Sequence, residues 1–135
     1  MTPLVATERR QSAWALWGPP LLYMAMIFGL STQSQLPSPP GRLTDKHVHF
    51  LVFGGLSALL LRALARGEWR RVTVATVVGA IVLTAVYGAS DELHQSFVPG
   101  RDASVLDAVA DALGASAAAS LLWAWGIIRD RRLRR

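Results

Sequence analysis

The sequence predicts an all-α integral membrane protein, folded as a bundle of four transmembrane helices. Hydrophobic residues make up 52% of the 135 residues and charged residues only 17%, which is too little polar surface for a soluble domain of this size. The apolar residues are collected in four long segments, and a helix needs about 20 mostly apolar residues to cross a bilayer. Most arginines lie in short clusters between these segments, as signals of membrane topology do.

The first helix is expected over about residues 13–31, where Ala13–Leu30 contains no charge. Pro19 and Pro20 should kink this helix or end its first turn, because proline cannot donate a backbone hydrogen bond. A cleaved signal peptide is the alternative interpretation of this segment. The apolar run is long for one, and the Ser- and Pro-rich stretch that follows offers no small-x-small cleavage site.

The second helix is expected over about residues 45–66, with Thr44 as its N-cap and Asp45 in its first turn, where a negative charge suits the helix dipole. His49 interrupts the apolar run near its start. Arg62 lies near its end, where a long basic side chain can reach the membrane surface.

The third and fourth helices are expected over about residues 72–95 and 103–128. The small residues Ala110, Gly114 and Ala118 are spaced by four along the fourth helix, so they share a face on which a neighbouring helix can pack closely. The chain is expected to form one membrane domain over residues 1–135. The sequence makes no prediction of the oligomeric state.

Lys and Arg residues predict the orientation in the membrane. The N-terminus, the second connection and the C-terminus carry most of them, so both termini are expected to be cytoplasmic and the first and third connections external. The predicted location is the inner (plasma) membrane, crossed several times. The chain has no cysteine, which excludes thiolate metal ligands, and no long basic patch, so nucleic acid is not expected as a partner.

Five of the nine carboxylates lie between Tyr87 and Gly114, around the third connection. Polar residues three or four apart share one helix face, and such pairs occur near the external ends of the last three helices. Three polar faces are therefore expected to line an outward-facing pocket. The candidate binding residues are Asp45, Lys46, His49, Glu92, Gln95, Arg101, Asp107 and Asp111.

Several of these polar residues also have a purely structural interpretation. Asp107 follows Ser104 by three residues, a capping-box spacing. Asp91 is explained as an ordinary helix-end residue and Arg101 as the neutraliser of a nearby carboxylate. His47, His94 and Asp102 are expected to be solvated, and Asp45 also suits its helix N-terminus alone.

Asp111 is the hardest of these residues to explain structurally. It lies about eight residues into the expected fourth helix, roughly 12 Å along its axis. A carboxylate at the helix centre costs about 2.5–3.5 kcal/mol on insertion scales, so Asp111 needs a partner or a wet cavity. A buried network that only locks the bundle is the remaining alternative.

Two segments resemble the VanZ-like family of small membrane proteins. "DKHVHFLVF", residues 45–53, resembles the D-K-x-x-H-F element of that family. Residues 87–114 resemble its second element, which has a tyrosine-glycine pair, E-x-x-Q, an aromatic residue, P-x-R, an aspartate, an asparagine or aspartate four later, and a glycine. Those positions are Tyr87, Gly88, Glu92, Gln95, Phe97, Pro99, Arg101, Asp107, Asp111 and Gly114.

The resemblance implies a four-helix membrane protein and a link to resistance against the glycopeptide teicoplanin, for which the family is named. It supplies no agreed catalytic residues. Many relatives carry asparagine at the position of Asp111, so the charge of Asp111 is not required by the family pattern.

The favoured function is the binding or shielding of a cell-envelope lipid or a lipid-linked wall precursor, with Lys46 and Arg101 on phosphate. The alternative is a membrane-embedded hydrolase or transferase that acts on a lipid head group, with His49 as general base oriented by Asp45. A metal hydrolase version would use His49, Glu92 and Asp107 as ligands. No metal-binding motif is recognisable, and no metal or cofactor is predicted. Transport is disfavoured because the inner halves of the helices are too apolar for a path.

Overall fold

A computed structural model of the chain describes residues 11–34, 41 and 44–133. It contains the four helices α1 (Ala13–Ser31), α2 (Asp45–Leu64), α3 (Val74–Gln95) and α4 (Val105–Leu133), and a short 3-10 helix, η1 (Trp69–Arg71). The described residues include no β-strand, so the predicted all-α class is confirmed. α2 and α3 are each two residues shorter than expected, and α4 starts two residues later and continues to Leu133.

All four long helices have the length and composition to cross a membrane. Large apolar side chains cover the outside of the bundle, which a water-soluble protein avoids but a bilayer accommodates. These exposed side chains include Leu21, Leu22, Val82, Val86, Leu113 and Leu121. The fold is therefore that of a multi-pass membrane protein.

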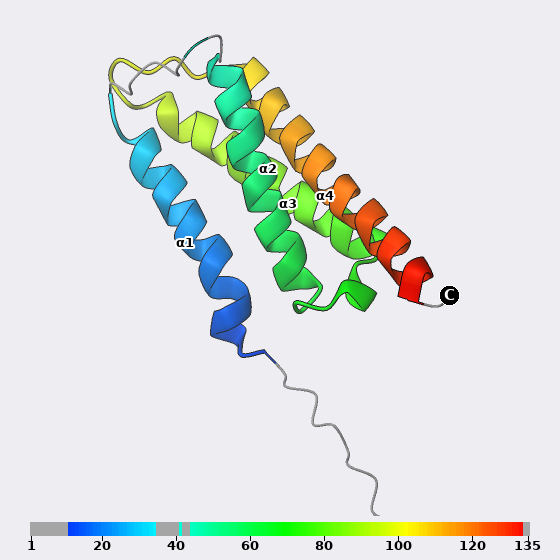
Figure 1. Ribbon diagram of the computed structural model, residues 1–135. Helices are drawn as coiled ribbons and strands as arrows, with labels where there is room; N and C mark the ends of the chain where they lie inside the picture. Colours follow the sequence, from blue (N-terminus) through cyan, green and yellow to red (C-terminus); the bar gives the residue numbers. More distant parts are fainter. Residues whose placement is uncertain (1–10, 35–40, 42–43, 134–135) are drawn as a thin grey trace, which may run out of the picture.

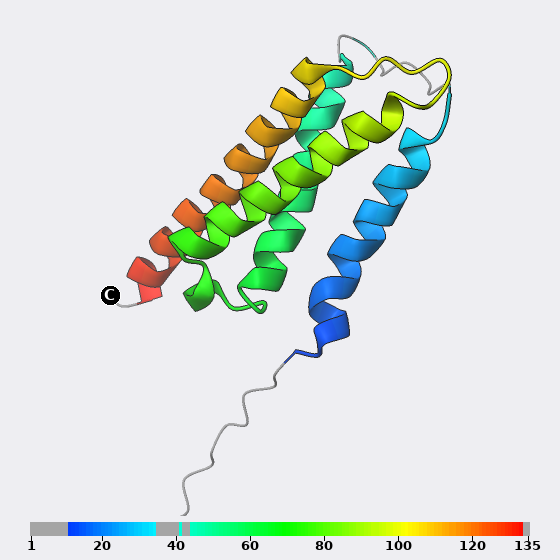
Figure 2. The same cartoon turned by 180° about the vertical axis from the view of Figure 1, so that it is seen from behind.

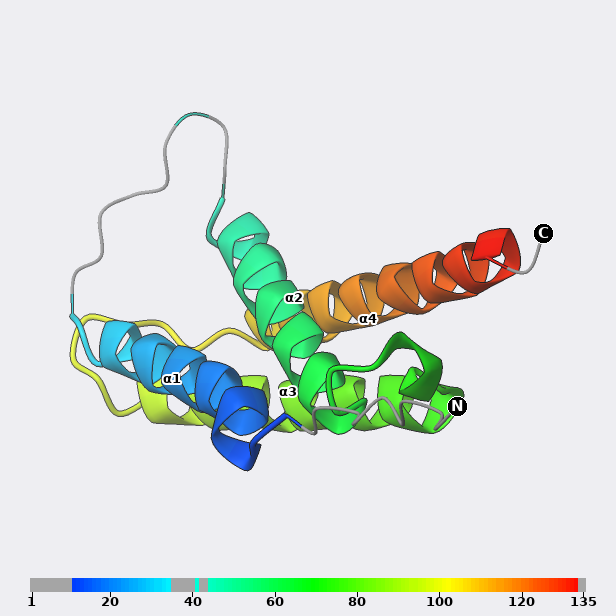
Figure 3. The same ribbon diagram turned by 60° about the horizontal axis from the view of Figure 1, so that its bottom comes forward.

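Two helices finish and two begin at one end of the bundle (Figure 1). At this end, called the polar end below, α1 and α3 finish and α2 and α4 begin. α2 makes its most extensive contacts with α4, and α3 packs behind both (Figures 1 and 2). α1 packs against α2 and α3 on the side of the bundle away from α4 (Figure 3).

The close approach of α2 and α4 depends on glycine. A Cβ atom on Gly54 would lie 3.2 Å from the carbonyl oxygen of Gly114 and 3.7 Å from Cβ of Ala118. A Cβ atom on Gly114 would overlap the carbonyl oxygen of Phe50. The small-residue face predicted on the fourth helix is therefore a packing face against α2.

α1 runs uninterrupted through Pro19 and Pro20, so the prolines do not end its first turn. Ala15 lies four residues before Pro19, and its carbonyl oxygen has no proline N–H to accept. The Nη1 of Arg62 donates to this oxygen at 2.9 Å, and its Nη2 donates to Oε1 of Gln11 at 2.9 Å. Arg62 thus replaces a missing helix bond and ties α2 to α1.

Gly114→Ala should lower the stability of the bundle by about 1–3 kcal/mol, because the added methyl group forces α2 and α4 apart. Gly29→Ala is the matched control, since a Cβ atom there meets nothing within 4 Å. Thermal unfolding in detergent measures both variants. Equal melting temperatures for Gly114→Ala and the wild type would contradict the close helix contact.

The predicted orientation can be tested with single cysteines, because the chain has none of its own. Asp102 and Glu68 are both exposed and lie at opposite ends of the bundle. A membrane-impermeant maleimide should label Asp102→Cys in intact cells and Glu68→Cys only after permeabilisation. The reverse labelling pattern would show that the termini are external.

Candidate functional site

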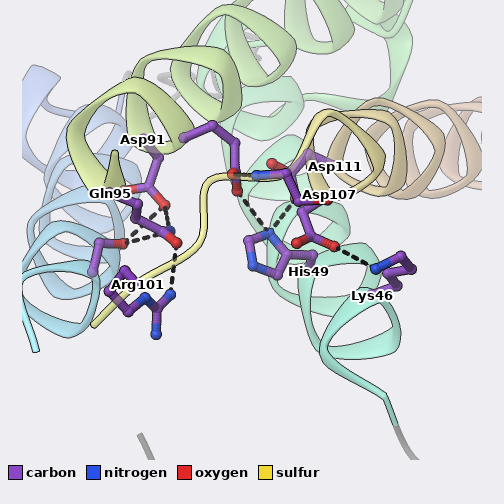
Figure 4. A network of polar contacts seen from close by, with 10 residues as sticks. Lys46, His49, Asp91, Gln95, Arg101, Asp107 and Asp111 are labelled. Atoms are coloured by element: carbon purple, nitrogen blue, oxygen red, sulfur yellow. Dashed lines mark hydrogen bonds and ion pairs between the residues drawn. The ribbon is translucent and has the colours of Figure 1, made fainter. Parts of the chain in front are cut away.

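The candidate residues at the polar end form two clusters (Figure 4). The His49 cluster joins α2, α3 and α4 and consists of Lys46, His49, Glu92, Asp107 and Asp111. The Asp91 cluster joins α1, α3 and the α3–α4 connection and consists of Ser31, Asp91, Gln95 and Arg101. The contacts among the predicted candidates fall within these two clusters.

The centre of the His49 cluster is the contact between α2 and α4 through His49 and Asp111. Nδ1 of His49 lies 3.0 Å from Oδ1 of Asp111, and the Asp111 side chain is completely buried. Asp111 is six residues past Val105, about 9 Å along the axis of α4 and less deep than expected. The predicted need for a polar partner is met by His49.

Gly88 creates the room for this carboxylate. A Cβ atom on Gly88 would lie 2.7 Å from Oδ2 of Asp111. Glu92 lies one turn away on the same helix, and Gly88 is expected to leave space for that residue. The structure instead shows that Asp111, from α4, occupies that space.

Glu92 connects the cluster to the α3–α4 connection. Its Oε2 accepts a hydrogen bond of 2.8 Å from the backbone N–H of Ser104, directly before α4. Its Oε1 lies 3.8 Å from Nδ1 of His49 and is buried without a hydrogen bond from any described residue. One oxygen of Glu92 therefore holds the start of α4, and the other lies towards His49 without a hydrogen bond from the described residues.

Lys46 and Asp107 form the rim of the cluster. Nζ of Lys46 lies 3.4 Å from Oδ1 of Asp107, with the lysine half exposed and the aspartate 7% exposed. The carboxylate of Asp107 thus pairs across to α2, and the cap-only interpretation of this residue is wrong. Asp45 is exposed in the first turn of α2 and offers an oxygen close to both His49 and Asp107.

Aromatic packing holds the His49 ring in place. The ring stacks on Phe53 with centroids 5.9 Å apart and an interplanar angle of 5°. Phe53 is 2% exposed, and its ring contacts that of Tyr87. The hydroxyl of Tyr87 donates to the carbonyl oxygen of Met24 at 2.6 Å. Below the His49 cluster, aromatic side chains and one hydrogen bond therefore connect α2, α3 and α1.

The Asp91 cluster contains two residues that the sequence did not identify as site residues. Oδ2 of Asp91 accepts hydrogen bonds of 2.8 Å from both Ser31 and Gln95. Asp91 is only 4% exposed, so its interpretation as an ordinary helix-end residue is wrong. The spacing of four between Asp91 and Gln95 could have suggested a shared face, but no sequence signal marks Ser31.

Arg101 lies directly after a tight turn. The N–H of Arg101 donates to the carbonyl oxygen of Val98 at 3.2 Å, and Gly100 has a φ of 81°, the positive φ that glycine supplies in a type II turn. The Nη2 of Arg101 donates to Oε1 of Gln95 at 2.7 Å. Arg101 therefore binds an amide and forms no ion pair with a carboxylate of the described residues.

The remaining polar residues have structural roles. Thr44 is the N-cap of α2, as predicted, and its N–H donates to Nδ1 of the exposed His47 at 3.1 Å. His94 is partly buried, with its ring stacked 4.5 Å from that of Phe28, so the expectation that it is solvated is wrong. Asp102 is exposed, as expected.

Two groups of described side chains have ligand atoms close enough for a metal ion. His49, Glu92 and Asp111 offer atoms within 4.8 Å of one another, and so do Asp45, His49 and Asp107. The metal set conceived from the sequence, with Asp107 beside Glu92, is not one of these groups. His49 is the residue that the two groups share.

A cavity of about 430 Å³ lies at the opposite end of the bundle, where α2, η1 and α4 meet. Arg62, Glu68 and Trp69 supply its polar and aromatic walls. No residue of the His49 or Asp91 cluster lines it.

The sequence matches the family model described as VanZ/LLP1 over residues 5–128, nearly the whole chain. The chain belongs to the VanZ/LLP1 family. The resemblance seen in the two polar segments is therefore confirmed. No curated protein and no solved structure gives a significant match. In this VanZ/LLP1 protein, the polar motif positions of both segments meet at the polar end.

Asp91→Ala should lower the free energy of unfolding by about 1–3 kcal/mol, because it leaves the buried side chains of Ser31 and Gln95 without their acceptor. Asp102→Ala, at an exposed position, should change stability little. Thermal unfolding of both variants in one detergent provides the comparison. Equal effects of the two substitutions would show that the Asp91 cluster does not hold α1 to α3.

Proposed function

We propose that this VanZ/LLP1 protein lies in the inner (plasma) membrane with its polar end outward, where it binds or shields the head group of a cell-envelope lipid or lipid-linked wall precursor. The observation that carries the proposal is the gathering of buried carboxylates from α3 and α4 around His49. Glu92 and Asp111 each keep a buried oxygen without a hydrogen bond from the described residues. Carboxylate oxygens of this kind accept hydrogen bonds from hydroxyl, amide or amine groups.

The rim of the site suits the phosphate of such a head group. Lys46 is half exposed beside the buried Asp107, so its ammonium group can reach a ligand without leaving the cluster. Arg101 holds Gln95 through one nitrogen, and a guanidinium group has further donors for a phosphate oxygen.

The outward orientation follows from the arginine-rich termini and α2–α3 connection, which favour the cytoplasmic side. A ligand at the polar end then belongs to the outer leaflet, where wall precursors are used. A contribution to glycopeptide resistance, the property for which the family is named, is part of this proposal.

The second candidate function is a hydrolase or transferase that acts on a lipid head group. The 3.0 Å contact between His49 and Asp111 favours it, because a histidine beside a carboxylate is the usual arrangement of a general base and its orienting group. The orienting carboxylate is then Asp111, in place of the Asp45 expected from the sequence. Chemical turnover of a bound lipid separates this function from binding alone.

Native mass spectrometry of the protein in mild detergent tests the proposal. The wild type should retain a phosphate-containing lipid, and Glu92→Gln should lose most of it, because the amide presents an N–H₂ group where the cluster has an acceptor. Glu68→Gln, an exposed carboxylate at the opposite end, should retain the lipid as the wild type does. A wild type without lipid, even after incubation with total envelope lipid, would overturn the proposal.

A further inference from the structure

We propose that His49, Glu92 and Asp111 together bind one divalent transition-metal cation of the zinc or manganese class. One imidazole and two carboxylates are a ligand set that both metals accept. The three residues come from α2, α3 and α4, so the cation is held by the three helices that meet at the polar end. Three protein ligands leave coordination positions open for water or an exogenous oxygen.

The spacing of the ligand atoms fits a small cation. Zinc–nitrogen and zinc–oxygen bonds of about 2.0–2.1 Å at tetrahedral angles place neighbouring ligand atoms roughly 3.3 Å apart. Nδ1 of His49 lies 3.0 Å from Oδ1 of Asp111 and 3.8 Å from Oε1 of Glu92. Both distances lie within about half an ångström of that value, and the carboxylate oxygens of Glu92 and Asp111 lie within 4.8 Å of one another.

The unpaired buried oxygen of Glu92 points independently to a cation. Oε1 of Glu92 lies 3.8 Å from Nδ1 of His49 and accepts no hydrogen bond from the described residues. Oδ2 of Asp111 also accepts none from them, but it lies towards Gly88. Among the described residues, Oδ1 of Asp91 and Oδ1 of Asp107 are also buried without a hydrogen bond, outside this group. The Glu92 and Asp111 side chains are 10% and 0% exposed. Leaving buried carboxylate oxygens unpaired is costly, and a bound cation removes that cost.

The charges around His49 favour a cation at the group of His49, Glu92 and Asp111 over one at the group of Asp45, His49 and Asp107. Lys46 lies 3.4 Å from Asp107, so its positive charge repels a cation from the Asp45, His49 and Asp107 group. Glu92 and Asp111 have no lysine or arginine paired to them among the described residues. Asp45 and Asp107 offer carboxylate oxygens within 4.8 Å of a ring nitrogen of His49.

The role of the cation is to hold a phosphate oxygen of the head group at its open coordination positions. This role rests on the proposed function. The binding of the cation itself rests on the three side chains alone. The two claims can therefore fail separately.

Mn²⁺ binding to the purified, detergent-solubilised full chain tests the site, with electron paramagnetic resonance as the readout. The wild type should bind one tightly held Mn²⁺ and show electron spin-echo coupling to an imidazole nitrogen. Zn²⁺ should displace this Mn²⁺. Absence of a bound ion, or of the nitrogen coupling, would overturn the inference.

Variants show whether the ion is held by these residues. Glu92→Gln should weaken Mn²⁺ binding by more than about tenfold, and His49→Gln should abolish the nitrogen coupling. Asp91→Asn removes a neighbouring buried carboxylate outside the site and should bind Mn²⁺ as the wild type does. If the His49 variant does not fold, the nitrogen coupling of the wild type and the Mn²⁺ affinity of the Glu92 variant still show whether these residues hold the ion. Equal weakening in the Glu92 and Asp91 variants would overturn the assignment.

Lipid retention with and without a chelator then separates the two proposals. Loss of lipid upon chelation links the cation to the head group. Lipid retained by a protein that binds no Mn²⁺ would refute the cation site alone, and Mn²⁺ bound by a protein that retains no lipid would refute the proposed function alone.

Discussion

The contact between His49 and Asp111 is the interaction on which the polar end of this VanZ/LLP1 protein depends. A fully buried carboxylate within a membrane-spanning helix is costly unless a polar partner meets it. That partner, His49, lies on α2, so Asp111 has its polar partner only where α4 packs on α2. Gly114 permits the helices to approach that closely, and Gly88 makes room for the carboxylate from the side of α3.

The two polar clusters make different kinds of contact at this end of the bundle. Asp91 has hydrogen-bond partners on its own helix and on α1, and its contacts hold helices together. Glu92, the next residue, uses one oxygen to hold the start of α4 and leaves the other unpaired towards His49. Asp91 likewise keeps its Oδ1 buried without a hydrogen bond from the described residues, but the unpaired oxygen of Glu92 is the one that lies 3.8 Å from His49.

Much of the fold followed from the sequence, because uncharged runs near 20 residues long have few alternatives to membrane helices. The pairings were not predictable, because helical spacing shows which residues share a face but not which helix that face meets. Asp91 illustrates this limit, since a carboxylate near a helix end looks solvated until α1 is seen beside it. Asp45 was expected to orient His49, but the carboxylate that lies 3.0 Å from the His49 ring is that of Asp111.

The central claim is that the His49 cluster is maintained for a ligand and not for stability. The most direct test is the unfolding free energy of the ligand-free double variant His49→Leu/Asp111→Val. Replacing both members of a buried polar pair by apolar residues is often neutral or stabilising. The account predicts a double variant at least as stable as the ligand-free wild type in the same detergent. A loss of several kcal/mol would show that the cluster mainly locks the bundle, and would contradict the account.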